Sequence, residues 1–213
     1  MSMLPESPVP GALNADASDV RDKKLVPPAV AANHSLQPGD LSAQSPRWTH
    51  RLHCGTSVLI RPIDEQDAQL ERRFIERLSP QSRRFRFLGQ IASPSDETLR
   101  QLTQIDFTRD VAFVAVIHEN NEKKEIGVAR YGLAADGQSC ECAVVVSDAW
   151  QNQGLGTLLM RHLIEIARQR GIRRMLSIDA ADNGPMRDLA AHLGFARKSD
   201  PDDSAQVIHS LDL

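Results

Sequence analysis

The chain has little cysteine, few aromatic residues and no long apolar run. Its three cysteines, Cys54, Cys140 and Cys142, are an odd and low number, which argues against a disulfide framework and fits a reducing cytoplasm. No stretch approaches the ~20 apolar residues that cross a bilayer. The segment Met1–Pro10 is polar and proline-rich, without the apolar centre of a secretory signal. We therefore expect a cytoplasmic protein without a membrane partner.

An excess of positive charge is also lacking. The formal net charge is -3 at pH 7 and the pI is about 6.2, so nothing draws the chain as a whole to nucleic acid. A hydrophobic content of 41% with 25% charged residues is ordinary for a soluble globular protein. At 213 residues there is room for one domain and a tail.

The first 47 residues differ from the rest. They contain seven prolines among Ala, Ser, Asn and Asp, and no helical or strand period persists. Such a segment buries too little apolar surface to offset its chain entropy. We predict that residues 1–47 are a disordered extension and that residues 48–213 form the folded domain. Whether the extension is regulatory stays open.

The folded part begins with helices and continues with strands. Its periodicity predicts helices over residues 64–78, 83–87, 95–104, 157–169 and 183–193, and strands over residues 56–61, 110–118, 125–133, 139–147, 175–180 and 207–211. Short polar turns join the middle strands into an antiparallel meander, and a β-α-β crossover follows. This order predicts an α/β domain with a mixed central sheet.

The most informative segment is a strand that passes through a glycine-rich turn into a helix, over residues 144–157. Unpaired N–H groups at a helix N-terminus form an anion site, and glycine lets a pyrophosphate approach the backbone. A dinucleotide fingerprint would need a third glycine where Leu159 stands, and a P-loop would need Lys-Ser/Thr after Gly156. A purely structural turn remains an alternative.

The run Gln151-Asn152-Gln153-Gly154-Leu155-Gly156 matches the Gln/Arg-x-x-Gly-x-Gly/Ala signature, and the chain resembles the GNAT superfamily of N-acetyltransferases over residues 56–213. Asn183 and the later Leu193-Gly194-Phe195 belong to the same resemblance. More narrowly, residues 59–63, 78–83, 126–130 and 141–146 are similar to the acetyltransferase domain of bacterial protein-lysine acetyltransferases. In some of those enzymes a large acyl-CoA-synthetase-like domain is fused to it, and this sequence has none.

The resemblance implies the GNAT fold, a mostly antiparallel sheet with a splayed strand pair flanked by helices. It also implies acetyl-CoA as cosubstrate and no metal. The implied cofactor-binding residues are Val144, Val145, Val146, Gln151, Asn152, Gln153, Gly154, Leu155, Gly156, Thr157 and Asn183. The favoured acceptor is a protein lysine. A small-molecule amine acetyltransferase and a non-catalytic acyl-CoA-binding sensor are the alternatives.

Glu141 is the candidate catalytic base. Strand alternation puts it on one face with Ala143, Val145 and Ser147, and partial burial there would raise its pKa toward a base's working range. The matching position of the lysine acetyltransferases carries a glutamate base, although an ordinary solvent-facing residue is the alternative. Many GNAT enzymes have a tyrosine general acid seven residues after the asparagine, where this chain has Ala190. Its only tyrosine, Tyr131, lies on an earlier strand.

Other polar clusters favour structural interpretations. Cys140 and Cys142 lack nearby histidines and are expected to be small buried residues. His50, His53 and Cys54 lack a fourth metal ligand and are expected in loops. The arginines fall into two groups. Arg83, Arg84 and Arg86 fit a solvated helix face, with steering of an acidic partner or of the cofactor's phosphates as the alternative. Arg168, Arg170, Arg173 and Arg174 suit the negative end of a helix.

Overall fold

An eight-stranded sheet forms the centre of the molecule. The computed structural model describes residues 46–88 and 93–213, so the predicted extension lies outside the described residues except for Pro46 and Arg47. The strand order is β1-β2-β3-β4-β5-β6-β8-β7. The strands are β1 (Trp48–Arg51), β2 (Ser57–Pro62), β3 (Asp110–Glu119), β4 (Glu122–Leu133), β5 (Ser139–Val146), β6 (Arg174–Ala180), β7 (Ala196–Ser199) and β8 (Gln206–Asp212). Neighbours are antiparallel except β5 and β6, which are parallel.

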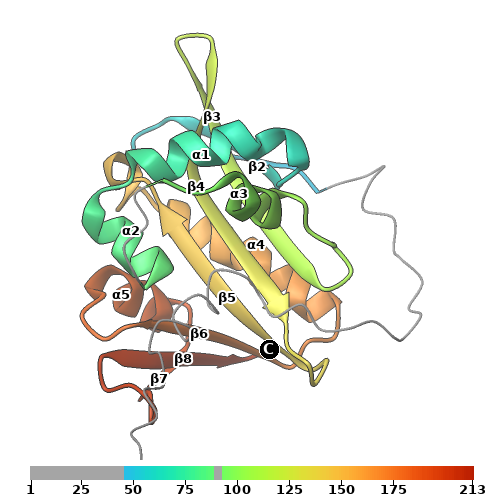
Figure 1. The fold of residues 1–213 in the computed structure, drawn as a ribbon, viewed down its shortest axis with the longest axis vertical. Coiled ribbons are helices and arrows are strands. Elements are labelled where there is room, and N and C mark those ends of the chain that lie inside the picture. The colour runs from blue at the N-terminus through green and yellow to red at the C-terminus, as the bar shows by residue number, and fades with distance from the viewer. Residues whose placement is uncertain (1–45, 89–92) are drawn as a thin grey trace, which may run out of the picture.

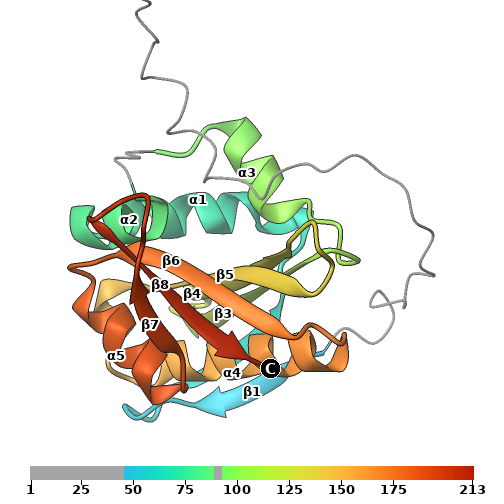
Figure 2. The same cartoon turned by 90° about the horizontal axis from the view of Figure 1, so that it is seen from below.

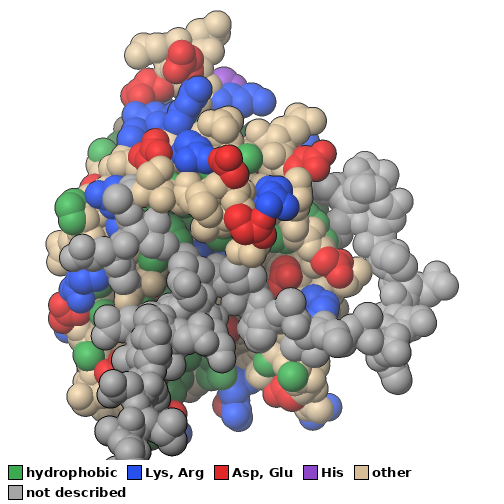
Figure 3. Space-filling model, in the orientation of Figure 1, with side chains coloured by type: hydrophobic (Ala, Val, Ile, Leu, Met, Phe, Trp, Pro, Cys, Tyr) green, Lys and Arg blue, Asp and Glu red, His purple; other side chains and the backbone are tan. Residues whose placement is uncertain are grey.

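Helices cover both faces of the sheet (Figures 1 and 2). The first face carries α1 (Ala68–Arg77), α2 (Pro80–Phe87) and α3 (Asp96–Thr103), and the opposite face carries α4 (Leu155–Gln169) and α5 (Gly184–His192). Over α1, α3 and the β3–β4 hairpin, acidic and basic side chains are interspersed (Figure 3). This face therefore presents no field of one sign. None of the helices within the described ranges has the length and apolar character that crossing a bilayer requires.

Each face of the sheet has its own hydrophobic cluster. On the α4 side, Leu159 and Leu163 pack with Phe113 and Ile126, and on the α1 side, Phe74 packs with residues of β3 and β4. Strand alternation separates the two clusters, because successive residues of β5 point to opposite faces. Cys142 belongs to the α4-side cluster, and Val145, three residues later, belongs to the α1-side cluster. The two cores thus hold β4 and β5 rigidly from both faces.

The predicted elements are present, with shifted ends. The predicted helix 64–78 is a 3-10 turn (Glu65–Asp67), capped by Asp64, followed by α1. Helix α2 begins at Pro80 because the Ser79 side chain caps it, and α4 begins two residues earlier than predicted. The β3–β4 turn contains only Asn120 and Asn121, both with positive φ. Such a two-residue turn favours Asn at αL positions.

Strands β1 and β7 were not predicted. All four residues of β7 are exposed, so the apolar alternation that reveals a strand is missing. Strand β1 pairs with β2, and it corrects the prediction that His50 is a loop residue. The Nε2 atoms of His50 and His162 are 2.7 Å apart, and Trp48 stacks on His162 at 3.8 Å between ring centres.

This histidine pair joins β1 to α4 and has the properties of a packed contact. Burial, followed by the neighbouring His50, lowers the pKa of His162 to about 4. A neutral imidazole is therefore the form that this packing favours at pH 7. His53 and Cys54 do lie in the turn between β1 and β2, as expected. Among the described residues no three His, Cys, Asp or Glu side chains are grouped so that they could hold a metal ion.

Candidate functional site

The parallel strands β5 and β6 separate after three residues. Their register contains Ser139↔Arg174, Cys140↔Met175 and Glu141↔Leu176, while β5 continues to Val146 and β6 to Ala180. On its other edge β5 stays paired with β4 as far as Val146. The edge of β5 beyond Glu141 is thus unpaired toward β6. This is the splayed strand pair that the sequence predicts.

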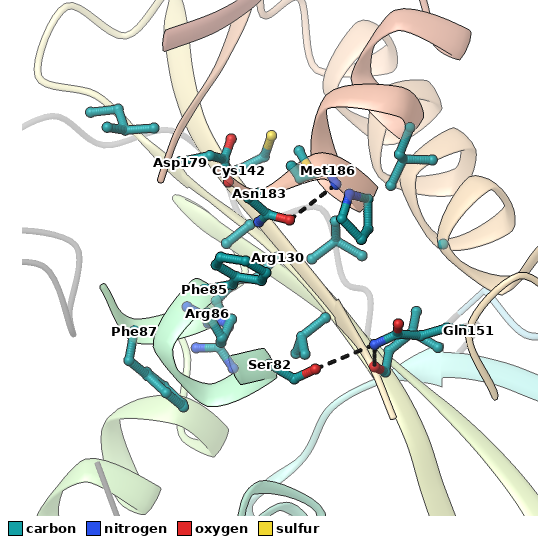
Figure 4. Close-up of a pocket in the computed structure, with 18 of the residues that line it drawn as sticks. Ser82, Phe85, Arg86, Phe87, Arg130, Cys142, Gln151, Asp179, Asn183 and Met186 are labelled. Carbon is teal, nitrogen blue, oxygen red and sulfur yellow. Dashed lines mark hydrogen bonds between the residues drawn. The ribbon is translucent and has the colours of Figure 1, made fainter. Parts of the chain in front are cut away.

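A cavity of about 860 Å³ occupies the gap between these strands. Its walls come from β5, from α2, from the turn before α4 and from the start of α5 (Figure 4). A space of this size is at the upper end for small-molecule and cofactor sites. The predicted residues that line it are Glu141, Val144, Val145, Val146, Gln151, Asn152, Gly154, Gly156, Thr157 and Asn183. The fold therefore brings nearly all of the predicted site into one cavity.

The turn before α4 places backbone N–H groups at the cavity. Asn152 and Gly154 both have positive φ, and Gly154 is the N-cap of α4 without any side-chain cap. The first amides of this 15-residue helix are left for a ligand or solvent. A Cβ on Gly154 would lie 3.2 Å from His53 Nε2, so a side chain here would push the His53 ring aside as well as strain a positive-φ backbone. The donor set fits a pyrophosphate.

Two residues of the predicted turn do not face the cavity with their side chains. Leu155 is 1% exposed and packs in the α4-side core. Gln153 is outside the cavity lining, and its carbonyl oxygen accepts a hydrogen bond from the His53 amide. Any contact of Leu155 with a phosphate would therefore come from its backbone N–H group. At these two positions the side chains point away from the cavity.

Gln151 and Asn183 have structural roles beside the cavity. Gln151 Nε2 donates to the Val146 carbonyl oxygen at 3.1 Å and to Ser82 Oγ at 3.3 Å. It thus joins the end of β5 to α2. Asn183 caps α5, because its Oδ1 accepts from the Met186 amide at 3.2 Å. Figure 4 shows the hydrogen bond between Gln151 and Ser82 and the one between Asn183 and Met186.

Helix α2 is held against the same turn by Asp148. The Asp148 carboxylate accepts hydrogen bonds from the Ser79 amide at 2.9 Å, from Ser79 Oγ at 2.7 Å and from Ser82 Oγ at 2.7 Å. Burial alone would raise the pKa of Asp148, but the hydrogen bonds from Ser79 and Ser82 outweigh it and lower that pKa. The ionised Asp148 side chain is therefore one of the contacts that hold the α2 wall of the cavity in place.

Glu141 lies where β5 and β6 part, and it lines the cavity. It is exposed, so the expectation of partial burial is wrong. Glu141 is paired with Gly132 of β4 and Leu176 of β6, so its exposure means that the helices on its face of the sheet leave this position uncovered. Cys140 and Cys142 are buried on the opposite face, as predicted. Burial raises the pKa of Cys140 to about 12 and that of Cys142 well above its usual value. Neither thiol is a nucleophile at neutral pH.

No tyrosine among the described residues lines the cavity. Ala190 is packed in the core, and Tyr131 is 2% exposed on the α4-side cluster. Burial raises the pKa of Tyr131 to about 12. Neither residue can deliver a proton to a group in the cavity from these positions.

Sequence reasoning missed several cavity residues, among them Ser82, Phe85, Arg86, Arg130 and Asp179. The prediction of a solvated face for Arg86 is wrong, since it is half-buried on the cavity wall. The sequence signal that could have revealed it is the mixture of arginine and phenylalanine over residues 83–87, because a fully solvated helix face would not contain phenylalanine at these positions.

Asp179 belongs to a buried network on β6 and β8. Its Oδ2 is 2.7 Å from Ser177 Oγ and 3.0 Å from His209 Nδ1, and all three residues are at least nine-tenths buried. A carboxylate within a β-rich run is the sequence feature that could have revealed it.

The fold and this cavity define a domain that belongs to the GNAT family of acetyltransferases. The model of the Acetyltransferase (GNAT) family matches residues 77–195. A relative from Pseudomonas aeruginosa, named Acetyltransferase PA5475, is 48% identical over 181 residues, which cover 85% of this chain and 97% of the relative.

Solved structures agree with this assignment. The GNAT domain of S. lividans PAT superposes with a TM-score of 0.72 at 27% identity, covering 78% of this chain and 97% of that one. Ribosomal-protein-S5-alanine acetyltransferase from Vibrio fischeri has a TM-score of 0.56 at 16% identity, covering 78% and 96%. The second likeness concerns the fold alone.

Proposed function

We propose that the protein transfers the acetyl group of acetyl-CoA to the side-chain amine of a protein lysine by direct attack on the thioester. The observation that carries this proposal is the continuous cavity that runs from Glu141 along the unpaired edge of β5 to the uncapped N-terminus of α4. An anion site and a carboxylate at opposite ends of one cleft suit a long, phosphate-bearing acyl donor and a cationic acceptor.

In this proposal the pantetheine of acetyl-CoA lies between β5 and β6. Backbone groups near Val144 and Val146 would hydrogen-bond it, as an added strand pairs with a sheet edge. The N–H group near Val145 would polarise the thioester carbonyl as an oxyanion donor. The pyrophosphate would lie at the Gln151–Thr157 turn, where the N-terminus of α4 has no side-chain cap. The supporting feature is the unpaired edge of β5 beyond Glu141.

The chemistry requires a base. A lysine amine with a pKa near 10.4 is neutral in about one molecule per few thousand at pH 7. Glu141 would take one proton from the ammonium directly or through a water, and the neutral nitrogen would then bond to the carbonyl carbon while the carbon–sulfur bond breaks. The second proton leaves the nitrogen as the amide forms and reaches the departing CoA thiolate through solvent. An exposed Glu141 is accessible to a lysine that arrives on another protein.

A protein lysine is favoured over a small amine by the closer sequence similarity to bacterial lysine acetyltransferases. The structural similarity to the GNAT domain of S. lividans PAT, which is 27% identical, supports the same choice of acceptor. We place the reaction in the cytoplasm, because all three cysteines are free thiols.

The test is an acceptor screen. The protein is incubated with acetyl-CoA and a panel of lysine-containing proteins and small amines, and thiol release and acetylated positions are followed, the latter by mass spectrometry. We expect thiol release that depends on the acceptor, with acetyl on lysine Nζ. Turnover of small amines alone would move the assignment to a small-molecule acetyltransferase. Tight acetyl-CoA binding with no turnover across the panel would indicate a sensor module.

A further inference from the structure

Arg86 is a half-buried cation on the wall of the cavity. It lies in the last turn of α2 and lines the cavity beside Phe85 and Phe87. Its guanidinium carbon is 5.1 Å from the centre of the Phe87 ring. Figure 4 shows Arg86 and Phe85 at the cavity with Arg130 nearby. The rings limit the solvent around the guanidinium, so its charge is weakly screened there.

No residue that the structure describes accepts a hydrogen bond from Arg86. Other arginines of this region do have acceptors. Arg84, on the same helix, donates to Asp182 Oδ2 at 2.6 Å, and Arg130 Nη2 donates to the Leu102 carbonyl oxygen at 2.9 Å. A guanidinium has five N–H donors in a planar fork. On the described residues, those of Arg86 are available to a ligand in the cavity.

Arg86 lies among charges of both signs. Burial lowers its pKa to about 10 and the positive charge of Arg130 acts in the same direction, while the carboxylates of Glu71, Glu141 and Asp179 act against them. The group therefore remains protonated at neutral pH. Burial, followed by the neighbouring Glu71, raises the pKa of Glu125 well above its usual value. None of the described carboxylates in this region accepts a hydrogen bond from Arg86.

Arg86 is nearer to the acceptor end of the cavity than to the phosphate end. Ser82 is the α2 residue that contacts Gln151 of the cofactor turn, and Arg86 follows one helical turn later, about 6 Å along the axis. On the sheet below, Arg130 pairs with Ala143, two residues from Glu141 on the same face of β5. The two arginines and Glu141 therefore offer opposite charges to one ligand.

We propose that Arg86 binds a carboxylate of the acceptor, so that the enzyme selects amines that carry a carboxylate a few bonds away. For a protein acceptor this means a lysine next to an aspartate or glutamate, or a lysine at the C-terminus. The inference rests on the proposed function, with the reactive amine at Glu141. A planar guanidinium and a carboxylate form paired hydrogen bonds, which give geometric selection as well as attraction.

The test compares matched lysine peptides that differ only in charge. One series has three peptides: the first has Asp before the lysine and Asn after it, the second has Asn before and Asp after, and the third has Asn at both positions. A second has the lysine at the C-terminus, either as the free carboxylate or as the amide, and this arm separates the two sources of the carboxylate. Free amino acids and their amides form a third arm for small acceptors. We expect kcat/KM to be about tenfold or more higher for at least one carboxylate form, mainly through KM.

The variant Arg86→Gln should remove that preference. We expect its kcat/KM to fall for the carboxylate acceptors and to stay within about twofold for their amide partners. Arg73→Gln is the matched control, because Arg73 is an exposed arginine of α1 outside the cavity lining; it should keep the wild-type preference. Equal loss for both acceptor forms, or a raised KM for acetyl-CoA, would overturn the proposal and assign Arg86 to the cofactor.

A failure of the proposed function gives a different result. If no acceptor turns over, the dissociation constants of the same peptides are measured by fluorescence anisotropy on the protein saturated with CoA. Tighter binding of the carboxylate forms that Arg86→Gln abolishes would support the inference even then. Equal affinity for both forms in the wild-type protein would overturn it.

Discussion

The two walls of the cavity are built by different means. On the α4 side, the ligand surface is backbone: the Gly154 turn, an uncapped helix N-terminus and a helix whose other face is packed in the core. On the α2 side, the surface is side chains, and the helix is attached through Asp148, Ser79 and Ser82. Helix α2 contains no buried residue. We infer that the backbone wall binds the cofactor, and that the side-chain wall and β5 select and activate the acceptor.

Glu141→Gln should produce the largest effect and separates chemistry from binding. The amide keeps the shape but cannot accept a proton, so turnover at pH 7 should fall on the order of 100-fold or more while acetyl-CoA affinity hardly changes. The loss should shrink at high pH, where more of the amine is already neutral. Glu122→Gln, an exposed change on the β3–β4 hairpin, is the control. Weaker acceptor binding with turnover intact at saturation would make Glu141 a recognition residue.

Gly154→Glu should break the backbone wall. A side chain at this positive-φ position would press on the His53 ring and distort the turn, its carboxylate would add negative charge beside the helix N-terminus, and calorimetry should show acetyl-CoA affinity lowered at least tenfold. Gly171→Glu controls for backbone strain, since Gly171 also has positive φ and its Cβ would meet nothing within 4 Å. Wild-type affinity in a folded Gly154→Glu protein would remove this turn from the cofactor site.

Asp148→Asn should loosen the side-chain wall by a smaller amount. Weaker bonds to Ser79 and Ser82 should cost about 1 kcal/mol, or roughly 2–4 °C in melting temperature. The pKa of Asp148 is lowered in the fold, so its stabilisation is present above the unfolded pKa and is lost as the pH falls through the folded pKa. The gap between wild type and variant should therefore close below about pH 4. A gap that persists in acid would mean that the charge is unimportant.

Removal of the extension should have the smallest effect. Both walls belong to residues 48–213, so a chain that begins at Gln44 should melt within about 1 °C of the full chain and bind acetyl-CoA equally well. Thermal melts and calorimetry on both chains make this comparison. A large loss of stability would show that the extension packs on the domain, contrary to its composition.

The difference between the walls also explains what the sequence could predict. The backbone wall is encoded locally, by glycines at fixed spacing between a strand and a helix, so residues 151–156 identify it. Tertiary contacts make the side-chain wall: Ser79 and Asp148 are 69 positions apart. Likewise the exposure of Glu141 depends on which helices cover its face of the sheet, which alternation along one strand cannot show. Arg86 was recognised as basic, but its burial depends on neighbours far along the chain.

The most direct test of the account is a single turnover with acetyl-CoA labelled in the acetyl group, in the presence of a lysine acceptor. Direct transfer predicts one free CoA thiol for each labelled acetyl-lysine and no label on the enzyme. Cys140 and Cys142 are buried thiols with raised pKa values, and the exposed Cys54 lies outside the cavity lining. Label on an enzyme side chain before it reaches the acceptor, or thiol release without acetyl-lysine, would contradict the account.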